Sequence, residues 1–192
     1  NETLVISTIT QSSAGIVHVI YGSWEGLDFD FIQSFYQNFL SGGEVAESYD
    51  YFGDALTVGD FDNDGKDDLV IGVPNEDFAY PVPINNAGAL HIIYGHSNGL
   101  GAGGSELLHQ SFDATGDERA EEIDYFGEVL AAGDYNGDGH DDLTVGMPHE
   151  SIGDKLNAGA IHVFFGDGTG ISDHLSSFVT EDPVGTSEAN DE

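Results

Sequence analysis

A long internal repeat is the feature that most constrains how this chain can fold. The segment YFGDALTVGDFDNDGKDDLVIGVP at 51–74 aligns without a gap with YFGEVLAAGDYNGDGHDDLTVGMP at 125–148. A shorter segment occurs three times, as AGIVHVIYG at 14–22, AGALHIIYG at 87–95 and AGAIHVFFG at 158–166. The copies are 71 to 74 residues apart, which indicates stacked units of one kind.

Each unit contains four short segments with the pattern of β-strands. In one unit these are residues 52–59, 68–74, 89–95 and 106–112, which are alternating or continuous apolar runs bounded by turn residues. No amphipathic pattern of helix length occurs. Four antiparallel strands per unit are typical of a β-propeller blade, which buries its faces against its neighbours. We therefore expect an all-β fold of propeller-type blades.

The phase of the repeat divides the chain into two blades and two partial ones. We expect the last strands of a repeat at 1–26, blades at 27–100 and 101–171, and a tail at 172–192 that leads to or completes a further blade. Propellers usually have about 4–8 blades, so the ring is incomplete within one chain. The chain is then a piece of a longer propeller, a member of a ring of copies, or a subunit joined head to tail through its termini.

An acidic loop precedes the second strand of each blade. Oxygen donors alternate along it, as Asp60, Asp62, Asp64, the carbonyl of Lys66 and Asp68 in one loop, and as Asp134, Asn136, Asp138, the carbonyl of His140 and Asp142 in the other. So many carboxylates repel one another unless a cation lies between them. Ca²⁺ takes six to eight oxygen ligands, whereas Mg²⁺ requires a tighter octahedron, so we predict two Ca²⁺ sites.

The loops differ from an EF-hand in their second half. An EF-hand needs a bidentate glutamate at position 12 and flanking helices. Position 12 is Ile71 in one loop and Val145 in the other, and strand-like segments follow both. Gly65 and Gly139 occupy position 6, where the chain must turn sharply, so we expect a positive φ there.

Motifs on either side of the loops resemble the FG-GAP repeat of integrin α-subunit propellers and their bacterial relatives. They are Phe52–Gly53 with GVP at 72–74, and Phe126–Gly127 with GMP at 146–148, each pair enclosing an acidic loop. The chain departs from the GAP pattern at Val73 and Met147, which replace alanine. The resemblance implies a fold that has seven blades in integrins, with calcium loops on the lower rim and partners on the opposite face. It also implies that the calcium ligands are Asp60, Asp62, Asp64, Asp68, Asp134, Asn136, Asp138 and Asp142.

Charge and composition limit the partners. The chain has 36 acidic and three basic residues and a net charge of −33, which disfavours nucleic acid and anionic membranes. It has no cysteine and no apolar stretch long enough to span a bilayer. Calcium dependence favours an extracellular or cell-surface location, where Asn1 of the Asn-Glu-Thr sequon would be a possible glycan site. The origin of the remaining acidity stays open, with a salty habitat as one hypothesis.

No constellation of catalytic residues stands apart from the repeat. His18, His91 and His162 occupy one repeated strand position, which indicates packing or hydrogen bonding between blades. No serine lies in a nucleophile elbow, and we expect no enzymatic activity of this chain. Trp24 lies in a turn where the other copies have small residues. Local packing is the favoured interpretation of this tryptophan, and ligand contact is the alternative.

The sequence therefore predicts an extracellular, calcium-binding repeat protein with an adhesion or structural role. In this interpretation calcium rigidifies the blades, and the partner is another protein or further copies of the chain. A subunit of a head-to-tail extracellular filament or surface assembly is one alternative. A non-catalytic propeller module of a secreted hydrolase is the other.

Overall fold

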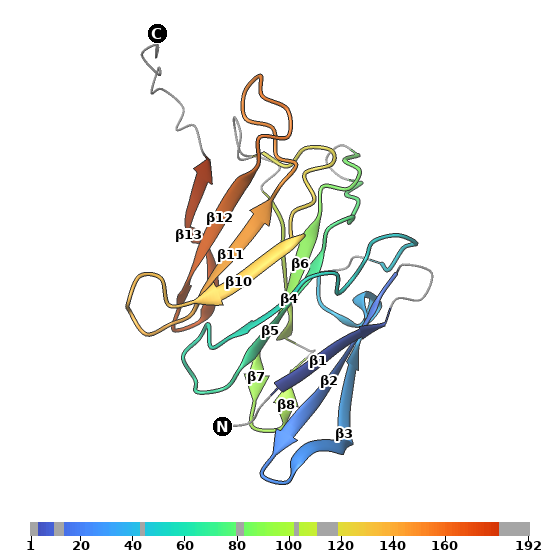
Figure 1. Cartoon of the computed structure of the whole chain (residues 1–192), viewed down its shortest axis with the longest axis vertical. Helices are drawn as coiled ribbons and strands as arrows, with labels where there is room; N and C mark the ends of the chain where they lie inside the picture. The colour runs from blue at the N-terminus through green and yellow to red at the C-terminus, as the bar shows by residue number, and fades with distance from the viewer. Residues whose placement is uncertain are drawn as a thin grey trace.

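The described part of the chain forms three larger antiparallel β-sheets, which follow one another in sequence order, and one two-stranded sheet (Figure 1). The computed structural model describes residues 4–9, 14–42, 45–79, 83–101, 104–110 and 119–180, without the side chains of 4–9 and 172–175. The all-β fold of four-stranded antiparallel blades predicted from the repeat is confirmed, since two of the sheets have four strands each.

Strand pairing groups the described residues as follows. The first sheet contains β1 (Leu4–Ile9), β2 (Ile16–Ser23) and β3 (Gly26–Phe35). The second contains β4 (Leu56–Gly59), β5 (Asp68–Val73), β6 (Ala89–Ile93) and β9 (Glu106–Leu108). The third contains β10 (Val129–Gly133), β11 (Asp142–Met147), β12 (Ala160–Asp167) and β13 (Gly170–Thr180).

Two small elements complete the description. The strands β7 (Gly95–His96) and β8 (Gly99–Leu100) form a hairpin after β6, and a short 3₁₀ helix, η1, spans Gln37–Phe39. The strands β3 and β9 each complete the sheet formed by the strands before them. The division of the chain at 26/27, 100/101 and 171/172 rests on sequence period, and it stays a prediction.

The central strand β5 is buried along its whole length because a sheet lies against each of its faces. Leu69 and Ile71 pack toward the first sheet, in a cluster with Val17 and Val19. Val70 points the other way, into a cluster shared with the third sheet. This two-sided burial explains why β5 has a continuous apolar sequence rather than an alternating one.

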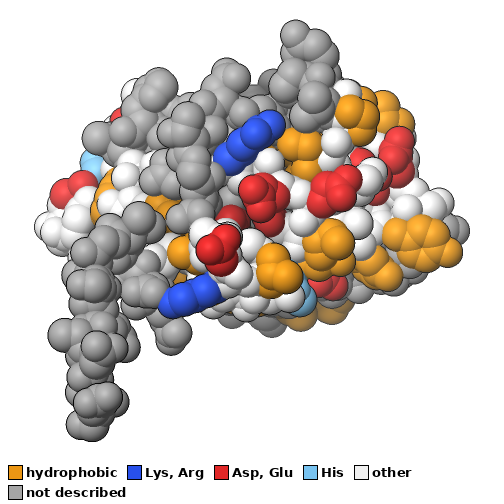
Figure 2. All heavy atoms as spheres, turned by 90° about the horizontal axis from the view of Figure 1, so that it is seen from above, with side chains coloured by type: hydrophobic (Ala, Val, Ile, Leu, Met, Phe, Trp, Pro, Cys, Tyr) orange, Lys and Arg blue, Asp and Glu red, His pale blue; other side chains and the backbone are white. Residues whose placement is uncertain are grey.

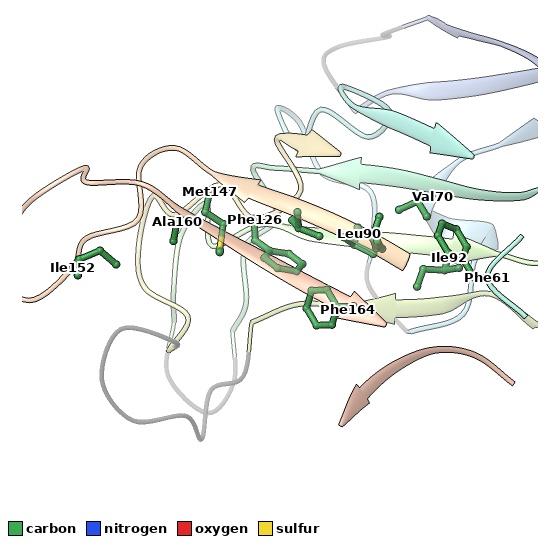
Figure 3. Packing of buried hydrophobic residues seen from close by; sticks show 11 residues of the cluster. Phe61, Val70, Leu90, Ile92, Phe126, Met147, Ile152, Ala160 and Phe164 are labelled. Carbon is green, nitrogen blue, oxygen red and sulfur yellow. The ribbon is translucent and has the colours of Figure 1, made fainter. Parts of the chain in front are cut away.

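The larger core lies between the second and third sheets (Figure 3). Leu90 and Ile92 of β6 meet Met147 of β11 and Phe164 of β12 there, and all four are at most 2% exposed. Burying an aliphatic side chain of this size contributes about 1.5–3 kcal/mol, so the interface is a main source of stability.

The Phe-Gly motif closes the interface between neighbouring sheets. The ring of Phe126 is fully buried in this core, and its backbone N–H donates to the carbonyl of Ala87, 3.0 Å away. Gly127 lies so close to the second sheet that a Cβ placed on Gly72 would be 2.1 Å from the Gly127 carbonyl oxygen. The phenylalanine therefore fills the core, and the two glycines allow the backbones to touch.

The repeated histidines of the second and third sheets pack against aromatic rings. His91 is 1% exposed, and its ring centroid lies 5.9 Å from that of Phe52. His162 stacks on Phe164 at 4.1 Å. His18 is bonded across the first sheet, with its Nδ1 2.8 Å from the Ser34 hydroxyl. Packing and hydrogen bonding both occur, but these contacts lie within single repeats and not between blades as expected, since Ser34 is on the neighbouring strand of the same sheet and Phe164 is on the same strand as His162.

The local-packing interpretation of Trp24 is wrong. This residue lies in the turn between β2 and β3, and 92% of it is exposed. The turn contains only two residues between the strands, so its side chains project into solvent.

Candidate metal centre

Each acidic loop connects the first two strands of a four-stranded sheet. One loop joins β4 to β5 and the other joins β10 to β11, so strands flank both loops, as predicted. Gly65 and Gly139 have φ angles of +84° and +96°, which confirms the sharp turn expected at position 6.

Three aspartates converge in the first loop. The carboxylate oxygens of Asp60, Asp62 and Asp68 lie within 4.8 Å of one another, and this is the one such group of acidic or histidine side chains found among the described residues. Asp60 is oriented by the loop backbone, because its two oxygens accept from the N–H groups of Asp64 at 2.9 Å and Gly65 at 3.0 Å. The loop thus aims its first carboxylate at the other two.

Asp68 is the buried member of this group. Its Oδ2 accepts from the N–H of Phe61 at 2.9 Å, and its Oδ1 accepts from the N–H of Gly95 at 2.8 Å. Burial raises the pKa of the Asp68 carboxyl to about 7, and the negative charges of Asp62 and Asp60 add to this effect. A cation among these oxygens would offset both causes, which is the fit expected of a hard metal ion.

The second loop repeats the backbone arrangement of the first. Asp134 accepts from the N–H groups of Asp138 at 3.1 Å and Gly139 at 3.1 Å, and the buried Asp142 accepts from those of Tyr135 and Gly166. The middle of the loop differs, because Asn136 replaces an aspartate and its amide donates to Asp138 at 2.9 Å. The N–H of His140, which donates to Asp138 Oδ1 at 2.9 Å, lowers the pKa of the Asp138 carboxyl, and the Asn136 amide adds to this effect.

The predicted ligands of the first loop therefore do not all lie in the close group of carboxylates. Asp64 lies outside the close group of three; it is exposed, and its Oδ1 accepts from the Lys66 N–H at 2.8 Å. The ligand roles of the carbonyls of Lys66 and His140 stay predictions. The glycan predicted at Asn1 falls outside the described residues.

Two residues that sequence reasoning missed complete the loops. Gly95 and Gly166 each donate a backbone N–H to the buried aspartate of their loop. A signal for them was present, because each ends a copy of the repeated AGxxHxxxG segment. Sequence reasoning missed these hydrogen bonds because each glycine lies far from its loop along the sequence.

No helix in the part of the chain that the structure describes has the length and hydropathy to cross a membrane.

Comparisons with known proteins agree with this architecture. The FG-GAP repeat family matches residues 52–93 and 126–164, which contain both loops. Phosphatidylinositol-glycan-specific phospholipase D of Bos taurus is 36% identical over 124 residues, which are 64% of this chain and 14% of that protein. Integrin alpha-5 of Xenopus laevis is 32% identical over 115 residues, 59% of this chain and 9% of the integrin.

A further integrin shows the same relationship. Integrin alpha-E of Mus musculus is 38% identical over 103 residues, which are 53% of this chain and 8% of that protein. The chain therefore spans only a small part of the length of these relatives. The two repeated units of this chain are FG-GAP repeats, of the kind found in integrin alpha subunits.

Proposed function

We propose that the chain is an extracellular calcium-binding module with an adhesion or structural role, in which calcium rigidifies the blades. The observation that carries this proposal is the convergence of Asp60, Asp62 and Asp68 at a strand-to-strand connection. Their donors are all carboxylate oxygens, the type that Ca²⁺ prefers. An extracellular site supplies calcium at the level that modules of this kind need, about 10⁻⁴–10⁻³ M. Likeness to integrin alpha-5 and alpha-E supports an adhesion role, with a protein as the partner.

Thermal melting in calcium and in chelator tests the proposal. We expect a higher melting temperature in millimolar calcium than in EDTA, because a ligand that binds only the folded state stabilises it by about 2.7 kcal/mol at a hundredfold excess over its Kd. Asp62→Ala should reduce this difference, since it removes one of the three grouped carboxylates.

Asp67→Ala is the matched control for that variant. Asp67 belongs to the same loop and carries the same charge, but it is exposed and outside the group of three. Its replacement should leave the calcium effect nearly unchanged. Identical melting of the unaltered chain in calcium and in EDTA would refute calcium binding.

A second candidate function is that of a subunit in a head-to-tail assembly. One face of the third sheet supports it, since Val129, Ile161 and Val179 are aligned across neighbouring strands and are 54%, 44% and 49% exposed. One repeat earlier, the corresponding Leu90 is fully buried by the next sheet. A second copy of the chain would cover the exposed row in the same way. A mass measurement in calcium that finds only monomers would exclude this candidate.

A third candidate is a non-catalytic module of a secreted hydrolase. It is supported by the 36% identity to a phospholipase D over a segment that makes up 14% of that enzyme. In this function the repeats would not supply the catalytic groups. Hydrolytic activity of the isolated chain would contradict it.

A further inference from the structure

An aspartate that is not in the ligand pattern joins the two acidic loops. Asp141 occupies position 8 of the second loop, between the carbonyl position of His140 and the buried Asp142. Its carboxylate belongs to the third sheet's loop but contacts the loop of the second sheet. The backbone N–H of Asp60 donates to Asp141 Oδ2 at 2.9 Å.

The contact is made in both directions. The backbone N–H of Asp141 donates in turn to the carbonyl oxygen of Asp60, at 3.1 Å. Both backbone groups of Asp60 are therefore bonded to a single residue of the neighbouring repeat. The main chain of Asp60 is held at the point where β4 ends and the acidic loop begins.

Close packing around this contact leaves no room for side chains. A Cβ on Gly166 would lie 2.3 Å from the carbonyl oxygen of Asp141 and 2.7 Å from that of Phe61, so the two loops meet at this glycine. A Cβ on Gly59 would lie 3.0 Å from Asp141 Oδ2. The junction is therefore a fitted contact between two repeats.

The position of the Asp60 main chain decides where its carboxylate points. Its two oxygens are already directed by the N–H groups of Asp64 and Gly65 in the same loop. With the loop and the main chain both fixed, the carboxylate lies in the group that Asp62 and Asp68 complete. Outer hydrogen bonds of this kind orient metal ligands and tune affinity.

We propose that Asp141 is a positioning residue for the cation site of loop 60–68, contributed by the neighbouring repeat. The inference rests on the proposed calcium binding, and it assigns to Asp141 the task of holding Asp60 in place. The equivalent residue of the first loop, Asp67, is exposed, and its carboxylate has no such contact with the described part of the chain.

Calorimetric titration with CaCl₂ tests the proposal. Asp138→Ala serves as the background, because it removes a predicted ligand of the second loop and leaves the first loop to be measured. In this background Asp141→Ala should weaken calcium binding about 10- to 100-fold, the usual loss when an outer-shell partner of a metal ligand is removed. Asp141→Asn should restore most of the affinity, since its amide oxygen can still accept from the Asp60 N–H.

Asp67→Ala controls for the loss of one negative charge beside the same loop. It should weaken binding by less than about fivefold, because a single exposed charge is screened by solvent. An equal loss in Asp67→Ala and Asp141→Ala would overturn the proposal. A failure of Asp141→Asn to restore affinity would overturn it as well.

Hydrogen exchange of the Asp60 amide in EDTA gives a readout that does not depend on calcium. The amide should be protected in the unaltered chain and should exchange much faster in Asp141→Ala. If the amide behaves in this way but the unaltered chain binds no calcium, the proposed function fails and Asp141 has only a structural role. An amide that exchanges at the same rate in both would refute the contact itself.

Discussion

Equivalent residues of the two repeats lie in different surroundings, because the third sheet packs against the loop of the second. Phe61 is fully buried in the core between the sheets, whereas its counterpart Tyr135 is 53% exposed. Asp60 is half-buried, and its counterpart Asp134 is exposed. The first loop therefore offers a cation a less solvated environment, in which charges interact more strongly.

Buried histidine makes stability depend on pH at the residue scale. Burial lowers the pKa of His91 from 6.5 to about 4, so the folded chain binds fewer protons than the unfolded chain between these values. The stability that depends on a neutral His91 is fully present above pH 6.5. As the pH falls toward 4, its loss lowers the free energy of unfolding by up to about 3 kcal/mol. We expect His91→Leu to lose less stability than the unaltered chain when the pH falls from 7 to 4.

Denaturant unfolding at a series of pH values measures this effect. His96→Leu is the control, because His96 also lies in the second repeat but is exposed. Carboxylates titrate in all three proteins, so the comparison isolates the imidazole. A pH profile of His91→Leu that parallels the unaltered chain would show that His91 plays no part in acid sensitivity.

At the scale of elements, the features that could be predicted from the sequence are those encoded within a few neighbouring residues. The four strands and the loop glycines were predictable, because alternation and a turn residue are written within a few positions of each other. Docking of Phe126 against the segment at 85–87 was not, since it joins different repeats. The position of Asp64 outside the close group was not predictable either, because equal spacing along the sequence does not fix the distances between carboxylates in space.

The close approach of Gly72 and Gly127 is the element-scale contact that a single methyl group should break. The Gly72→Ala methyl would meet the Gly127 carbonyl oxygen at 2.1 Å, so the sheets would have to separate. We expect Gly72→Ala to lower the free energy of unfolding by about 3 kcal/mol, the upper end of the usual cost of overpacking. Urea unfolding followed by circular dichroism would measure it.

Gly146 provides a matched control on the third sheet. It occupies the same place in its repeat, but a Cβ there would meet only the side chain of Val129, at 3.1 Å. Gly146→Ala should therefore cost the single chain less than about 1 kcal/mol. Equal destabilisation by the two variants would mean that strand geometry, and not docking of the Phe-Gly turn, limits position 72.

At the scale of the whole molecule, charge and apolar surface coexist. Figure 2 shows acidic side chains spread among hydrophobic ones on one face of the molecule. Two calcium ions would offset only four of the 33 net negative charges, and most of the acidic residues lie outside the two loops. Such a charge keeps copies of the chain apart unless a specific surface brings them together.

We expect the exposed row of Val129, Ile161 and Val179 on the third sheet to be the surface that brings copies of the chain together. Ile161→Glu places a charge in the row and should turn a head-to-tail assembly into monomers without changing the melting temperature of the monomer. Light scattering coupled to size exclusion would measure the mass. Leu156→Glu is the control, because Leu156 is 81% exposed but lies in a loop. Dissociation by both variants alike would point to charge repulsion alone.

Two contacts of the third repeat complete the unit before it, one made by a turn and one by a loop. Phe126 docks on the preceding strands, and Asp141 holds the preceding loop. A gene could therefore lengthen such a protein by duplicating whole units, since every new junction would reproduce an existing one. A duplication of any other length would set a turn against strands that it does not fit, so the new junction would lack these contacts.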